Sequence, residues 1–147
     1  MRAGALATVI LAALASLSAA STWPPWQTIA QHDVTHGPSQ RAFVAGSLQA
    51  SNLFAVFLPP ADRAALAAVD YRTQAVVAVF RPVPSTGYIL EIRSLRRRRS
   101  RLTIGLAIRP PTGPVSPVIT NACHVVSVPK RLLGTPLPRR LVVRVET

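Results

Sequence analysis

The sequence predicts a mainly β domain of the α+β class: an antiparallel sheet folded on itself like a sandwich, with one or two short helices before the main sheet. Three observations carry this prediction. From residue 74 onward, the helical period gives way to strand-like segments, most of which alternate with a period of two. Prolines and glycines divide this region into short segments. A helical period occurs only earlier, and 147 residues suit a single domain.

The elements expected before residue 74 are two short strands and two short helices. Residues 27–34 and 41–45 are expected to be strands, separated by a Gly-Pro turn. Ser47 is expected to cap a helix over residues 47–57, because its hydroxyl can accept a hydrogen bond from a free backbone N–H. The residues expected on the buried stripe of this helix are Ala50, Leu53, Phe54 and Phe57. A pair of prolines ends it, and a second short helix is expected over residues 61–69.

The chain is organised around residues 69–92. Residues 74–80 are apolar after the first position, which is typical of a central strand that is covered on both faces. The strand expected over residues 87–94 alternates between apolar and polar positions, so one of its faces is expected to lie in water. The loop between these strands contains two prolines and a glycine, and we expect it to hold one shape.

Three further strands follow. Residues 102–108 alternate in the same way and are expected to form a hairpin with residues 87–94 across an arginine-rich turn. Residues 118–128 and 141–145 are expected to complete the sheet. Because no helix is expected between strands after residue 74, parallel pairing is not expected.

The first 20 residues have the features of a secretory signal peptide. An arginine at position 2 precedes an apolar run that ends in small residues. This run is shorter than the roughly 20 residues that a membrane anchor needs. We therefore expect cleavage between Ala20 and Ser21, and an exported protein, periplasmic or secreted, whose single domain covers residues 21–147.

The chain is strongly basic, with 17 Lys and Arg against 5 Asp and Glu. Five of these bases form one cluster: Arg96, Arg97, Arg98, Arg99 and Arg101. A nucleic-acid partner is not expected, because the protein is expected to be exported and its aromatic residues are not interleaved with the bases. We expect a solvated hairpin tip, with weak contact to an anionic surface or an acidic partner as the alternative.

The residues do not favour an enzyme. His32, Asp33 and His36 are close in sequence but span a strand and a turn, so they are not expected to bind a metal ion. Cys123 is the only cysteine, and His124 should point to the opposite face of the same strand. We therefore expect a buried thiol rather than a nucleophile, no cofactor and no catalytic residues.

The segment VDYRTQAVVAVFRPVPSTGYILEIRSL resembles the PrcB-type protease-complex subunit family in its C-terminal domain. The matching features are the turn at residues 69–71 and the loop Ser85-Thr86-Gly87-Tyr88, in which Thr86 stands where the family has a glycine. The strand at residues 120–128 and its Pro-Lys exit are also similar, so the core of the likeness covers residues 69–130.

This resemblance implies an exported, non-catalytic, β-rich domain that assists or stabilises a cell-envelope protease complex. The loop implied to contact the protein partner consists of Pro84, Ser85, Thr86, Gly87 and Tyr88. The same loop also resembles the first binding loop of chagasin-type cysteine-protease inhibitors, although the other two loops of that family have no clear match. A basic protein that binds the envelope surface is the third possibility, and the sequence does not indicate an oligomeric state.

Overall fold

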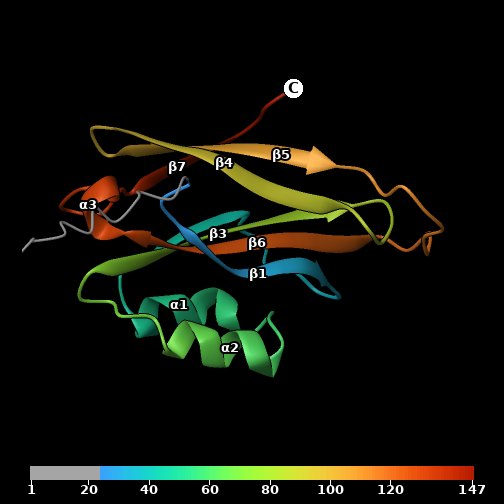
Figure 1. The fold of residues 1–147 in the computed structure, drawn as a ribbon, viewed down its shortest axis with the longest axis horizontal. Coiled ribbons are helices and arrows are strands. Elements are labelled where there is room, and N and C mark those ends of the chain that lie inside the picture. The colour runs from blue at the N-terminus through green and yellow to red at the C-terminus, as the bar shows by residue number, and fades with distance from the viewer. Residues whose placement is uncertain (1–23) are drawn as a thin grey trace, which may run out of the picture.

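The computed structural model describes residues 24–147, which form two sheets and a helical layer (Figure 1). The first sheet has the order β1-β6-β3-β2, with bounds Gln27–Val34, Thr120–Pro129, Gln74–Val83 and Ala42–Ala45. The second has the order β4-β5-β7, with bounds Ile89–Arg98, Arg101–Arg109 and Arg140–Val145. Helices α1 (Leu48–Ala55) and α2 (Pro60–Ala67) lie against the first sheet, on the side away from the second. The predicted mainly β, sandwich-like fold is therefore confirmed.

Two apolar cores hold the three layers together. The core between the sheets includes Val77 and Val79 of β3 and Leu106 of β5. The core between the first sheet and the helices is built around Phe54 and Phe80, whose ring centroids are 6.3 Å apart. Because β3 contributes to both cores, its apolar run is buried on both faces, as predicted for a central strand.

Helix α1 begins as predicted but buries a different stripe. The Ser47 hydroxyl accepts a hydrogen bond from the Ala50 N–H at 3.1 Å, which confirms the cap. The predicted stripe is wrong at Leu53, which is 70% exposed, whereas Ser51 is fully buried. Ser51 can be buried because its hydroxyl lies 2.7 Å from the hydroxyl of Tyr71, so a polar side chain takes a core position without losing its hydrogen bond.

Strand β3 continues beyond the predicted end at residue 80 and includes Pro82. The Phe80 N–H donates to the Arg41 carbonyl, so the backbone nitrogens at positions 80 and 82 face the β2 side of β3. Strand β2 begins only at Ala42, and no β2 partner lies opposite Pro82. A proline is tolerated there because its missing N–H has no ladder partner to lose.

The arginine cluster is not a loop. Arg96, Arg97 and Arg98 belong to β4 and Arg101 opens β5, which leaves a turn of two residues, Arg99 and Ser100. Arg99 adopts a positive φ of 56°, a conformation that tight hairpin turns require. The predicted hairpin is confirmed, but its strands are longer than expected, so most of the cluster lies on a sheet.

The expectation that no strands pair in parallel is wrong. Strand β7 pairs in parallel with β5. Between these two strands the chain crosses to the first sheet as β6 and returns through the short helix α3 (Lys130–Leu133), which the sequence did not predict. A parallel pair needs a long crossover connection, and here β6 and α3 provide it in place of a helix packed on the second sheet.

The predicted signal peptide, its cleavage point and Trp23 lie outside the described residues. None of the helices between residues 24 and 147 has the length and apolar character needed to cross a bilayer.

Candidate functional site

The loop predicted to contact a partner connects β3 to β4 and lies at one end of the sandwich (Figure 1). The long connection from β5 to β6 lies at the same end, whereas the arginine turn between β4 and β5 lies at the opposite end. We call residues 84–88 and 110–119 together the loop platform.

Hydrogen bonds join the two loops of the platform to each other. The Thr86 N–H donates to the Ser116 carbonyl at 3.2 Å, and the Ser116 N–H donates to the Thr86 hydroxyl at 3.1 Å. Gly87 has a φ of 86°, and a side chain there would place its Cβ 3.0 Å from Cβ of Pro111. Gly87 is therefore required both for its backbone conformation and for the close approach of the second loop.

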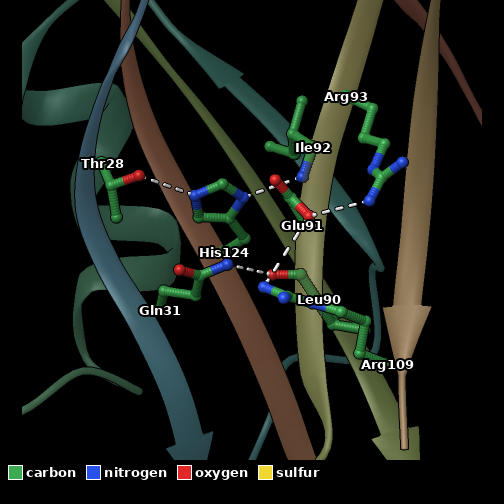
Figure 2. Close-up of polar contacts among 8 residues, drawn as sticks. All are labelled: Thr28, Gln31, Leu90, Glu91, Ile92, Arg93, Arg109 and His124. Atoms are coloured by element: carbon green, nitrogen blue, oxygen red, sulfur yellow. Dashed lines mark hydrogen bonds and ion pairs between the residues drawn. The ribbon is translucent and has the colours of Figure 1, made fainter.

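Strand β1 fixes the platform from the side. The Asp33 carboxylate accepts a hydrogen bond from the Gly87 N–H at 2.9 Å. Gln31, two residues earlier, donates from its side chain to the Leu90 carbonyl at 2.6 Å, at the start of β4 (Figure 2). The first contact joins β1 to the loop before β4, and the second joins β1 to β4 itself, which are edge strands of the two sheets.

A buried histidine completes this connection (Figure 2). The His124 ring of β6 accepts a hydrogen bond at Nδ1 from the Ile92 N–H, at 2.8 Å, and its Nε2 lies 2.9 Å from the Thr28 hydroxyl. The acceptor role of Nδ1 places the proton of the neutral ring on Nε2, which donates to Thr28. We call Thr28, Gln31 and His124 the sheet clamp.

The clamp requires a neutral imidazole. His124 is 3% exposed, and its burial lowers the pKa to about 4, although the nearby Glu91 carboxylate acts in the opposite direction. Glu91 itself forms ion pairs with Arg93 at 3.4 Å and Arg109 at 3.8 Å. A proton on Nδ1 would oppose the Ile92 N–H, so acid should break the contact between the sheets.

The platform exposes apolar side chains. Val118 and Ile119 are 59% and 77% exposed, and they directly precede Thr120, which pairs with Val83 of β3. Val115 is also exposed, and its methyl group lies close to Gly87. The second loop of the platform therefore presents one exposed apolar side chain beside Gly87 and two more just before β6.

The residues predicted for the partner-binding loop differ in exposure. Pro84 and Gly87 are exposed, whereas Ser85 and Thr86 are half-buried. Tyr88 packs against the core between the sheets and is also half-buried. The structure therefore places Tyr88 partly in the core and leaves the tip of the loop accessible.

The fold separates the residues of the His-Asp-x-x-His segment. His32 hydrogen bonds to Asp62 of α2 at 2.5 Å, Asp33 holds Gly87, and His36 is exposed in the following turn. Burial lowers the pKa of His32, but its contacts with Asp62 and the Asp33 carbonyl outweigh this effect, and the net pKa is raised. Within residues 24–147, no three His, Cys, Asp or Glu side chains are grouped so that they could hold a metal ion.

Cys123 is a core residue, as predicted. It is 1% exposed and faces the helices, whereas neighbouring His124 faces the other sheet. Burial raises the pKa of its thiol to about 11. The thiolate is therefore scarce at neutral pH, which is the opposite of what a nucleophile needs.

The predicted basic cluster divides into structural and exposed members. Arg97 donates from Nε to the Arg99 carbonyl at 2.7 Å and from its guanidinium to the carbonyls of Leu133 and Pro136. It therefore joins β4 to the segment before β7. Arg96, Arg98 and Arg99 are exposed, and Arg101 is half-buried.

Sequence reasoning missed the residues that support the loop, Thr28, Gln31, Asp33 and Ser116. The one sequence signal for these supports was Asp33, an acid near the end of a predicted strand, but its partner Gly87 is distant in sequence.

No family model, no curated protein and no solved structure matches this chain.

Proposed function

We propose that this protein is a non-catalytic accessory subunit that binds a protein partner through the loop platform. The observation that carries the proposal is that the Pro84–Tyr88 loop is fixed from two directions, by Ser116 and by Asp33, while apolar side chains beside it are exposed. A loop that is already ordered loses little conformational entropy on binding, so more of the contact energy contributes to affinity.

The nature of the partner follows from the resemblance of residues 69–130 to the PrcB-type family. That likeness favours a component of a cell-envelope protease complex, and the predicted signal peptide would deliver the chain to that compartment. The exposed Val118 and Ile119 supply the apolar contact that the centre of a protein interface usually contains.

A pull-down with the full chain tests this proposal. The tagged protein is expected to retain a protease from envelope extract, and the retained protease is expected to keep its activity against a peptide substrate. Ile119→Gln should weaken retention at least about tenfold, since a central apolar anchor contributes more than about 1.4 kcal/mol. Leu53→Gln is the matched control, because Leu53 is similarly exposed but lies on α1.

Two results would contradict the proposal. One is retention of no protease, and the other is equal retention by the parent chain and the Ile119→Gln variant. Circular dichroism and thermal melting of both variants establish that any loss reflects the surface and not the fold.

A second candidate is inhibition of a cysteine protease, in the manner of chagasin-type proteins. The observation that favours it is that both loops of the platform lie at one end of the sandwich and are joined by hydrogen bonds. Such paired loops could enter a protease cleft together. Papain activity in the presence of the full chain tests this candidate, which requires saturable inhibition that the Gly87→Val change abolishes.

A further inference from the structure

The structure assembles an arginine face that the sequence does not reveal. Alternate residues of β4, β5 and β7 point away from the sandwich, because their neighbours Leu102, Ile104 and Val143 point into the core between the sheets. The arginines on this outer side are Arg96 and Arg98 of β4, Arg101 of β5, and Arg140 and Arg144 of β7. We call these five residues the arginine face.

The register places three of these arginines in one row. Arg98 is paired with Arg101, and Arg101 is paired with Arg140, so the row crosses all three strands. Directly opposed residues on neighbouring strands have Cβ atoms about 5 Å apart, and like charges at that separation repel. An anion bound to this row would relieve that repulsion.

Within the described residues, no ion pair joins an acid to the arginine face. The ion pairs of the second sheet join Glu91 to Arg93 and Arg109, which lie nearer the loop platform. Glu146 lines the same hollow as four arginines of the face, but it accepts a hydrogen bond from the Ser94 hydroxyl at 2.8 Å and forms no ion pair with them. Among residues 24–147, the five arginines of the face therefore form no ion pair, and the single carboxylate beside them leaves a large excess of positive charge.

The shape of the face suits phosphate groups that are spread over a surface. A hollow of about 560 Å³ is lined by four arginines of the face, together with one acid and several small residues: Arg96, Arg98, Arg101, Arg144, Glu146, Ser94, Thr103, Gly105 and Val145. A second hollow of about 320 Å³, at the hairpin tip, shares Arg98 and Arg101 and adds Arg140. Guanidinium groups bind phosphate through paired N–H donors, and three strands spread these donors over about 10 Å.

We propose that the arginine face binds the phosphate groups of an anionic phospholipid bilayer. Arginines spread over three strands can contact several phosphate groups of a bilayer at once, and strands β4, β5 and β7 carry no aromatic side chain on which nucleic-acid bases could stack. This site is independent of the loop platform, which lies at the opposite end of β4.

Vesicle binding by the full chain tests the proposal. Binding to phosphatidylcholine vesicles that contain about one-third phosphatidylglycerol is compared with binding to phosphatidylcholine alone, at low salt and at about 0.5 M salt. Any binding through residues 1–20 would be common to both kinds of vesicle, so the measured quantity is the preference for the anionic ones. This preference is expected to disappear at high salt.

The double change Arg98→Gln with Arg140→Gln is expected to weaken anionic binding roughly 25-fold, at about fivefold for each arginine. The matched control is Arg41→Gln with Arg63→Gln. It removes the same charge from the residue before β2 and from α2, and it should change binding by less than about twofold. Arg96→Gln with Arg144→Gln provides a second, independent pair on the face. Far-ultraviolet circular dichroism establishes that each variant is folded.

Four results would overturn the proposal. They are an equal loss in the control, equal binding to both kinds of vesicle, displacement of the protein by millimolar inorganic phosphate, and tighter binding to duplex DNA that depends on the same arginines. The last two would assign the face to small phosphates or to nucleic acid.

Discussion

Acid should loosen the contact between the two sheets through His124. The folded pKa of His124 is about 4, against an ordinary value of 6.5. Since the unfolded chain binds the proton more tightly, the stabilising effect is complete above about pH 6.5 and is lost as the pH falls towards 4. A proton on Nδ1 removes the acceptor for the Ile92 N–H, so the loss should be localised at the junction of β4 and β6.

The magnitude follows from the two pKa values. Between about pH 7 and pH 5, proton binding to the unfolded chain lowers the free energy of unfolding by about 2 kcal/mol through this one residue. His32 acts in the opposite direction, because its pKa is raised in the folded state and its stabilisation is lost as the pH rises. The contribution of His124 is therefore measured as a difference between proteins and not from the parent alone.

Urea unfolding of the full chain and of His124→Asn at several pH values between 5 and 7 provides this difference. The asparagine carbonyl can still accept from the Ile92 N–H but cannot titrate, so the variant should be less stable at pH 7 and should lack the loss of about 2 kcal/mol. Equal pH dependence of the two proteins would refute the role of the His124 ring.

Three further predictions concern single residues. Gly87→Val should lower the free energy of unfolding by about 1 to 3 kcal/mol because of its positive φ, whereas Gly113→Val, which meets no atom within 4 Å, should be nearly neutral in urea unfolding. Arg97→Ala should cost about 1 to 2 kcal/mol because three carbonyls lose a donor, whereas Arg98→Ala should leave the melting temperature almost unchanged. Cys123 should react with a thiol reagent only on unfolding, and rapid labelling of the native chain would contradict its burial.

Local patterns were sufficient to predict most of the elements. The apolar run of residues 74–80 identified the central strand, and the cap at Ser47 identified the start of α1. Leu53 was misplaced because helical spacing alone could not distinguish between two stripes one residue apart. The stripe that contains Ser51 is the buried one, because the Ser51 hydroxyl can form a hydrogen bond with Tyr71, which is distant in sequence.

The supports of the candidate site could not be predicted, because they depend on which strands become neighbours. Asp33 can contact Gly87 because β1 and β4, the edge strands of the two sheets, lie on the same side of the sandwich. Arg140 joins Arg101 only through the parallel pairing of β7, which sequence reasoning did not expect. A strand's alternation shows that it has two faces but not which strand lies beside it.

The length of strand β4 sets the separation between the loop platform and the arginine turn. The strand starts beside the loop platform and ends at the arginine turn, and its ten residues extend over about 30 Å. Under the two proposals above, a protein partner at the loop platform and a bilayer at the arginine face would bind towards opposite ends of β4, so that neither would obstruct the other.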